Sequence, residues 1–342
     1  MNKLAAVALL CATSLPVAAQ TKVLVAKSRV PSVTFDDGSD HRSFALPTDC
    51  DEQGRSYVKL VKPVPGMVGP LLRLSSKGVL EAEFDTDGAV MNLYAVRPNG
   101  GVAMVHVDGG TKVVDNFGRD GKRESSVPLE RPPIPFFPMQ IAVFRSGEML
   151  VAGLQYHPGY KAGTAIYDPA GHLVKQFVLD GDAEIEHAIE VGDARYARAP
   201  GEGNEAVRRS VAITGDDGFV YLMRATSPAT VYVISSGGEV IRKIVVNAPT
   251  DKALPDFGIR VVKNRLAIKF SRECDDPVIF SSCRGTVYTV VDATTGQKLA
   301  DYETEDETAG PIACYAPDPD RFSTFSIGAG EHRLEIVEAA PK

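Results

Sequence analysis

The feature that most constrains the fold of this chain is an alternation of two series of tight turns. Both series are rich in Gly, Asn and Asp, which tolerate the positive φ angles that a tight hairpin requires. The first series lies at residues 51–54, 98–101, 146–147, 216–218, 263–264 and 318–320. The second lies at residues 76–78, 120–121, 169–171, 237–238, 295–296 and 329–330. This alternation divides the chain into six similar units.

Each unit predicts four antiparallel strands. The fourth unit shows this most clearly, with strands expected over residues 210–214, 219–224, 230–234 and 240–246. A repeated sheet of four antiparallel strands is typical of a β-propeller blade. The first-series turns, counted from residues 54, 101, 147, 218, 264 and 320, are spaced 47, 46, 71, 46 and 56 residues apart. The basic period near 46 lies within the range expected of propeller repeats, with insertions in two units.

The two ends of the chain complement each other. After Gly330 the last unit has room for a single strand, over residues 332–339, whereas residues 22–26 form a strand-like segment with no partner before the first unit. We expect this segment to supply the missing outer strand, which would close the ring and remove exposed strand edges. The sequence therefore predicts an all-β fold, a six-bladed β-propeller closed by an N-terminal strand that completes the last blade. Two independent β-sandwiches are the alternative. They would not explain why one extra strand at the N-terminal end matches one missing strand at the C-terminal end.

The first residues have the pattern of a secretory signal peptide. Lys3 precedes an apolar run over residues 4–10, and small residues end at Ala19. We expect cleavage after Ala19, a signal peptide over residues 1–19 and a single propeller domain over residues 20–342, in the periplasm or outside the cell. The apolar run is shorter than the ~20 residues of a membrane-spanning helix. Cys11 could mark a lipoprotein, but Leu9 and Leu10 stand where small residues would be expected.

The cysteines of an exported protein can pair, because its compartment is oxidising. We predict a disulfide between Cys274 and Cys283, which lie nine residues apart in a polar loop. Cys50 and Cys314 fall on the innermost strands of units one and six, which are neighbours in a closed ring. A disulfide between them would lock the closure; the alternative is two small buried apolar residues facing the tunnel.

Propeller geometry places both turn series on one face, here called the short-turn face, and the longer connections on the opposite loop face. Function usually lies on variable loops carried by a rigid scaffold. The longer segments are residues 34–44, 131–138, 156–163, 180–206, 247–259, 272–284 and 301–310. Their excess of acidic over basic residues is larger than the net charge of −7 of the whole chain. We therefore expect an acidic loop face that recognises a cationic partner, a metal ion or a basic protein segment. Solvated loops that simply collect Asp and Glu are the alternative.

Candidate ligand-binding residues follow from these loops. They are Asp36, Asp37, Asp40, His41, Tyr156, His157, Asp182, Glu184, Glu186, His187, Asp275 and Asp276. Carboxylate oxygens are the ligands that calcium prefers, so a calcium ion held by Asp36, Asp182, Glu186 and Asp275 is one hypothesis. Turn chemistry alone is the competing explanation of each cluster. Residues 183–190 predict a short helix. The segment 85–88 resembles the start of a calcium loop but lacks the downstream acidic ligand.

The rhythm of Asp- or Asn-Gly turns before each second strand, with Gly before each fourth, resembles the six-bladed propellers of the NHL and TolB-like type. The resemblance covers most of the mature chain and implies a scaffold that hosts binding proteins, lactonases and lyases alike, so function must be argued from a site. The acidic balance argues against nucleic acid as a partner, and we expect a monomer that binds a protein or a small molecule.

Two functions remain open on the sequence. A non-catalytic binding or assembly module is favoured, because the sequence has no nucleophile elbow, zinc-protease helix or phosphate loop. The alternative is a calcium-dependent hydrolase or lactonase, in which the metal orients a carbonyl and activates water.

Overall fold

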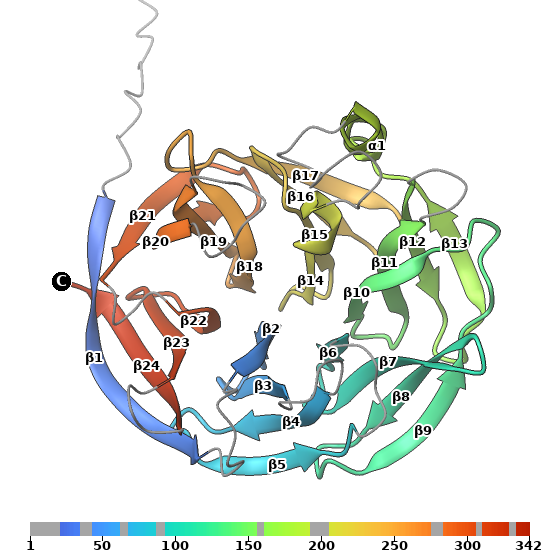
Figure 1. Ribbon diagram of the computed structural model, residues 1–342, viewed down its shortest axis with the longest axis horizontal. Coiled ribbons are helices and arrows are strands. Elements are labelled where there is room, and N and C mark those ends of the chain that lie inside the picture. Colours follow the sequence, from blue (N-terminus) through green and yellow to red (C-terminus); the bar gives the residue numbers. More distant parts are fainter. Residues whose placement is uncertain are drawn as a thin grey trace, which may run out of the picture.

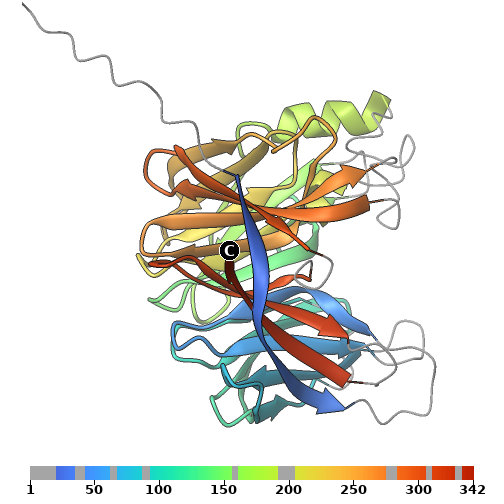
Figure 2. The ribbon, with the colours of Figure 1, turned by 90° about the vertical axis from the view of Figure 1, so that its left-hand side faces the viewer.

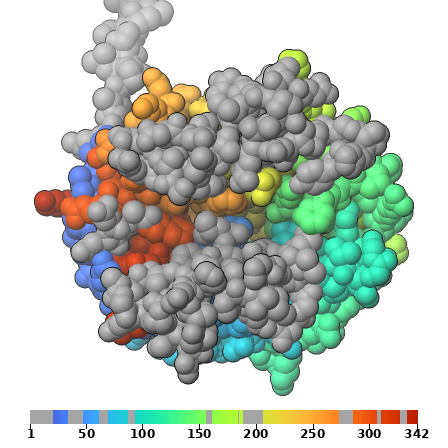
Figure 3. Space-filling view, in the orientation of Figure 1, coloured from blue at the N-terminus to red at the C-terminus, as the bar shows by residue number. Residues whose placement is uncertain are grey.

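The computed structural model describes residues 21–34, 43–61, 68–86, 93–155, 161–191, 205–274, 283–305, 310–327 and 333–342. Their strands form a propeller, with sheets arranged around a common axis (Figure 1). In the space-filling view, the coloured segments around the rim follow the chain order from cyan through green to orange (Figure 3). The all-β prediction is confirmed.

Four blades are separate four-stranded sheets, each with its first strand innermost. Blade one comprises β2 (Ser43–Cys50), β3 (Ser56–Val61), β4 (Val68–Leu74) and β5 (Leu80–Phe84). Blade two comprises β6 (Tyr94–Val96), β7 (Val102–Asp108), β8 (Thr111–Phe117) and β9 (Arg123–Pro128). Blade three comprises β10 (Phe137–Val143), β11 (Met149–Gln155), β12 (Lys161–Tyr167) and β13 (Leu173–Phe177). Blade four comprises β14 (Val211–Thr214), β15 (Val220–Arg224), β16 (Ala229–Ile234) and β17 (Val240–Val246).

The remaining strands form one eight-stranded sheet with two halves. The first half holds β18 (Leu254–Val262), β19 (Arg265–Cys274), β20 (Cys283–Asp292) and β21 (Lys298–Thr304). The second half holds β22 (Ile312–Ala316), β23 (Arg321–Ile327), β24 (Arg333–Pro341) and β1 (Thr21–Thr34). A parallel pairing of β1 with β21, from Thr21 opposite Asp301 to Leu24 opposite Thr304, joins the halves.

The N-terminal strand completes the last sheet, as predicted. β1 pairs antiparallel with β24, placing Val25 opposite Ala340 and Val30 opposite Ile336 (Figure 2). It extends well past the predicted residues 22–26, to Thr34. The strand therefore covers two edges that would otherwise be open, those of β24 and β21.

The last predicted turn of the second series, residues 329–330, lies outside the described residues. The strand after it was expected to be the fourth of its unit, but β24 is the third strand of its half and β1 is the fourth. The third-to-fourth connection in this half is replaced by the two ends of the chain. The other strand predictions hold closely, and in blade four the observed bounds lie within one residue of the expected ones.

The core lies between neighbouring sheets. Ala103 and Val105 of blade two pack with Ile141 and Val143 of blade three, for example. Inner strands such as β11 are buried along almost their whole length, whereas the outer strand β9 is mostly exposed. The inner strands therefore read as continuous apolar runs because both of their faces meet another sheet.

Glycines of the second turn series let each blade pack on the one before it. Gly121 has φ +82°, and a Cβ there would lie 2.2 Å from the carbonyl oxygen of Glu83 in blade one. Gly171 repeats this geometry, with φ +89° and the same 2.2 Å approach to the carbonyl oxygen of Pro128 in blade two. A side chain at either position would therefore separate the blades as well as strain the turn.

The innermost strands of blade one and the second half are joined by a disulfide. Cys50 of β2 bonds Cys314 of β22, across 264 residues of chain. Of the two interpretations of Cys50 and Cys314, a disulfide that closes the ring is therefore confirmed, and a pair of unbonded apolar residues is not. For the predicted Cys274–Cys283 disulfide, β19 and β20 place the two residues opposite each other, but their side chains lie outside the described part of the structure.

Two helices interrupt the strand pattern. The predicted helix is present as α1 (Asp182–Val191), and a short α2 (Glu205–Arg208) precedes blade four. Within the described ranges, no helix is both long enough and apolar enough to cross a membrane.

Candidate functional site

Many of the predicted ligand residues lie outside the described residues, so their roles stay predictions. These are Asp36, Asp37, Asp40, His41, Tyr156, His157, Asp275 and Asp276. The proposed calcium site therefore has two of its four members, Asp182 and Glu186, in the described part.

Asp182 and Glu186 both belong to α1, and their carboxylates contact other segments of the chain. The carboxylate of Asp182 is fully buried, lies 3.2 Å from Nε of Arg224 and accepts the backbone N–H of Leu179. Glu186 accepts the backbone N–H of Ala162 at 3.1 Å. The side chain of His187 is exposed, and that of Glu184 lies outside the description. Among the described residues, no three His, Cys, Asp or Glu side chains form a group that could hold a metal.

Other loop-face carboxylates are paired with lysines of the strands. Asp180 lies 2.8 Å from Lys243. Asp256 lies 2.6 Å from Lys269. In the described part of the loop face, the acidic excess is thus partly offset by bases that the loop segments themselves do not contain.

Near the axis, polar groups tie the innermost strands together. Arg260 of β18 is buried and donates to the carbonyl oxygens of Ala313 (2.9 Å), Ile312 (2.8 Å) and Thr48 (2.7 Å), so one guanidinium links β18, β22 and β2. Burial raises the pKa of Asp49, and the charge of Arg260 opposes that shift. Asp49 accepts the backbone N–H of Cys50 at 2.7 Å. These contacts stabilise the hub of the propeller.

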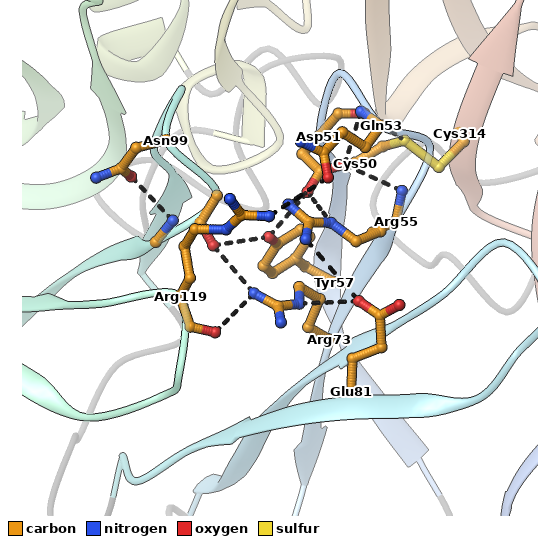
Figure 4. Close-up of polar contacts among 12 residues, drawn as sticks. Cys50, Asp51, Gln53, Arg55, Tyr57, Arg73, Glu81, Asn99, Arg119 and Cys314 are labelled. Atoms are coloured by element: carbon orange, nitrogen blue, oxygen red, sulfur yellow. Dashed lines mark hydrogen bonds and ion pairs between the residues drawn. A yellow bond between two sulfur atoms is a disulfide. The ribbon is translucent and has the colours of Figure 1, made fainter.

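A polar cluster on the short-turn face joins blades one and two (Figure 4). Asp51 accepts from Nε of Arg55 at 2.6 Å and from the hydroxyl of Tyr57 at 3.1 Å. Tyr57 also contacts the carbonyl oxygen of Gly100 in blade two, at 3.0 Å. Arg73 donates to the carbonyl oxygen of Arg119 at 2.8 Å. Because every one of these contacts bridges a turn or two blades, the cluster is structural.

A cavity of about 520 Å³ lies along blade two, here called the blade-two cavity. Its lining residues are Asp85, Thr86, Met104, His106, Val107, Asp108, Asp115, Phe117, Gly121, Lys122 and Arg123. Asp85 follows β5 and Asp108 ends β7, so both stand at strand ends of the loop face. The volume falls within the ~300–1,000 Å³ typical of small-molecule pockets.

A histidine–aspartate pair lines this cavity. Nδ1 of His106 lies 3.2 Å from Oδ2 of Asp115, whose other oxygen accepts the hydroxyl of Ser126. Nη1 of Arg123 lies 3.5 Å from the same carboxylate. A carboxylate held on Nδ1 fixes the orientation of an imidazole and leaves the second ring nitrogen for another partner.

A buried lysine lies behind the cavity. Lys59 of β3 is fully buried, and its Nζ lies 3.3 Å from Sδ of Met104, a lining residue. Burial lowers the pKa of Lys59 to about 8. A cavity wall backed by a desolvated amine is unusual, because buried ammonium groups are normally paired.

His106, Asp115 and Lys59 were not among the site residues predicted from the sequence. A usable signal existed for Asp115, which interrupts the apolar run of β8 and is buried there. The sequence did not show that His106 of β7 would contact Asp115. That contact depends on the β7–β8 register, which sets Met104 opposite Asp115 and so places His106, two residues further along β7, diagonally across from Asp115.

Comparisons with known proteins place the chain by fold alone. No protein-family model matches the sequence, and no curated protein matches it. A solved protein of unknown function from Dyadobacter fermentans is 13% identical, with a TM-score of 0.52 over 93% of this chain and 99% of that one. A gluconolactonase from Xanthomonas campestris, XC5397, is 14% identical, with a TM-score of 0.51 over 94% of this chain and 98% of that one. The Dos1 propeller is 10% identical, with a TM-score of 0.44 over 91% and 82% of the two chains.

Proposed function

We propose that this protein is an exported six-bladed propeller of the NHL or TolB-like type that binds a small cationic ligand in the blade-two cavity. Counting the halves of the eight-stranded sheet as two blades, each with its own innermost strand, gives six. The signal-like pattern of residues 1–19 supports export.

The blade-two cavity is the observation that carries the binding role. Its size suits a small molecule, and Asp85 and Asp108 add negative charge at its loop-face end. Lys122 and Arg123 lie at the opposite, short-turn end. A ligand with an amine at one end and hydrogen-bond acceptors at the other fits this polarity. The hypothesis that the acidic loop face recognises a cation is thereby restricted to this cavity.

Calorimetric titration with 4-aminobutanamide, which has an ammonium group at one end and a carbonyl acceptor at the other, tests this proposal. We expect saturable binding at one site per chain, weakened about tenfold by Asp108→Asn because a charge-assisted contact is lost. Asp251→Asn removes an equally exposed carboxylate that does not line the cavity, and it should leave the affinity unchanged. Equal weakening by both variants would show a general charge effect and contradict a site in this cavity.

The His106–Asp115 pair favours a second candidate, a lactone hydrolase. An imidazole oriented by a carboxylate can take a proton from water as that water attacks a lactone carbonyl. The fold shared with a gluconolactonase makes glucono-δ-lactone the first substrate to assay. We expect turnover to fall about 100-fold in His106→Gln if the pair is catalytic. Hydrolysis at the uncatalysed rate in the unaltered protein would leave binding as the function.

A further inference from the structure

A second cavity, of about 260 Å³, lies beside α1 and blade four and is here called the blade-four cavity. Its lining residues are Gly181, Ile185, Arg224, Thr226, Ser227, Pro228, Thr230, Tyr232, Lys243 and Val245. The described lining thus holds two cationic side chains and several hydroxyl groups but no carboxylate. This is the opposite polarity to that of the loop-face end of the blade-two cavity.

Arg224 is the unusual member of this lining. Its side chain is 1% exposed, and Nε lies 3.2 Å from the buried carboxylate of Asp182. Nη1 and Nη2 are buried as well, and neither has a hydrogen-bond partner among the described residues. Buried donors are normally satisfied, so a guanidinium with two such nitrogens can take an acceptor that the described part of the protein does not supply.

Lys243 brings a second positive charge to the same cavity. Its Nζ lies 2.8 Å from Asp180 and 5.7 Å from the ring centre of Tyr232. These contacts hold the ammonium group in place while leaving part of its donor capacity unused. Asp180 and Asp182 do not line the cavity. They contact Lys243 and Arg224, respectively, on the side of each cation that faces away from the cavity.

We propose that the blade-four cavity binds the carboxylate group of a ligand. The two oxygens of a carboxylate match the spacing of Nη1 and Nη2, whose planar fork forms paired hydrogen bonds. Binding would leave the Nε contact with Asp182 intact, because that contact uses a different nitrogen. The volume is below the ~300 Å³ at which pockets for whole drug-sized ligands begin, so the cavity takes a small acid or the end group of a larger molecule.

This proposal is independent of the site proposed in the blade-two cavity, since the two cavities share no residue. It also differs from the calcium hypothesis, because Asp182 here orients an arginine. The site would allow a propeller that takes a cation at one blade to take an anion at another.

Calorimetric titration of the unaltered protein tests the inference, with acetate, N-acetylglycine and inorganic phosphate at constant ionic strength set by sodium chloride. N-acetylglycine represents a peptide C-terminus, and N-acetylglycinamide is its uncharged match. We expect saturable binding of the carboxylates and none of the amide. Tighter binding of N-acetylglycine than of acetate would indicate a peptide end as the ligand, and the reverse order would indicate a free small acid. Phosphate binding more tightly than both carboxylates would overturn the carboxylate assignment.

Two variants locate the site. Arg224→Lys keeps the charge beside Asp182 but removes the fork, and Lys243→Gln removes the second charge; each should weaken carboxylate binding by about tenfold or more. Lys175→Gln is the matched control, because Lys175 donates to the carbonyl oxygen of Gly238 and does not line the cavity.

The result is decisive even if Arg224→Lys fails to fold, because Lys243→Gln changes a partly exposed residue. The inference is overturned if no carboxylate binds the unaltered protein in a saturable way. It is equally overturned if Lys243→Gln and Lys175→Gln bind carboxylates alike.

Discussion

At the scale of single residues, Lys59 is a buried amine without an acidic neighbour among the described residues. The sulfur of Met104 is the hydrogen-bond partner that the described structure gives its ammonium group. Replacing buried charged groups with apolar residues of similar size often stabilises a protein by roughly 1–4 kcal/mol. Lys59 therefore costs stability.

We predict that Lys59→Met raises the free energy of unfolding at pH 7, by an amount of that order. Burial lowers the pKa of Lys59 to about 8 from the ordinary 10.5. Between these two values the unfolded chain binds more protons than the folded one, so stability of the unaltered protein rises with pH. The advantage of the variant should thus be complete below pH 8 and shrink as pH approaches 10.5.

Urea unfolding of both proteins from pH 6 to pH 10 measures this difference. Lys77→Met, at an exposed turn residue, is the control and should show no such trend. A constant difference between Lys59→Met and the unaltered protein across the range would contradict a lowered pKa.

Individual acidic residues show why the site was harder to predict than the fold. Asp182 was a sensible metal ligand on sequence grounds, because it lies in a long acidic loop. Its partner Arg224 is 42 residues away, on a strand of another segment. Pairings over such distances depend on how the blades meet, which the composition of a loop does not reveal.

At the scale of elements, the strands were predictable because each depends on local signals. Glycine and aspartate turns mark the hairpins, and apolar runs mark the inner strands; Lys263 and Asn264 adopt φ of 48° and 60° at their predicted turn. The position of β24 in its sheet was predicted wrongly for a different reason. Which strand of a sheet a segment becomes depends on what pairs with it, and there the partner of β24 comes from the other end of the chain.

We predict that removing residues 1–34 prevents stable folding, whereas removing residues 1–20 does not. The longer deletion removes β1, which would expose the edges of β24 and β21. It also removes the buried side chain of Leu24 from the hydrophobic cluster that contains Tyr302 and Phe322. Thermal unfolding followed by circular dichroism, with size-exclusion chromatography to detect aggregation, distinguishes the two shortened proteins. A cooperative, monomeric protein lacking residues 1–34 would show that β1 is dispensable.

At the scale of the whole molecule, the ring is closed twice, by β1 on the outside and by the Cys50–Cys314 bond near the axis. A disulfide stabilises chiefly by restricting the unfolded chain, and the effect grows with the length of the closed loop. With 264 residues between the cysteines, this bond lies at the long end of that range.

We predict that the double variant Cys50→Ser and Cys314→Ser loses roughly 2–5 kcal/mol of unfolding free energy. Guanidinium unfolding of the variant and of the unaltered protein gives this value. Guanidinium unfolding of the double variant with and without a reductant is the control for the predicted Cys274–Cys283 disulfide. Any remaining response of the double variant to the reductant would come from Cys274 and Cys283, and equal stability of the variant and the oxidised protein would contradict a stabilising closure.

The position of the two chain ends has a consequence for how the molecule is made. The backbone N–H of Lys342 donates to the carbonyl oxygen of Val23 at 3.0 Å, so the last residue contacts one of the first in the described chain. Because β1 is synthesised before β24, it cannot pair on that side until residues 333–341 have been made. Contacts so distant in sequence form slowly and leave intermediates with open edges. Until β24 has been synthesised, β1 has no antiparallel neighbour, and its open edge can pair with other chains.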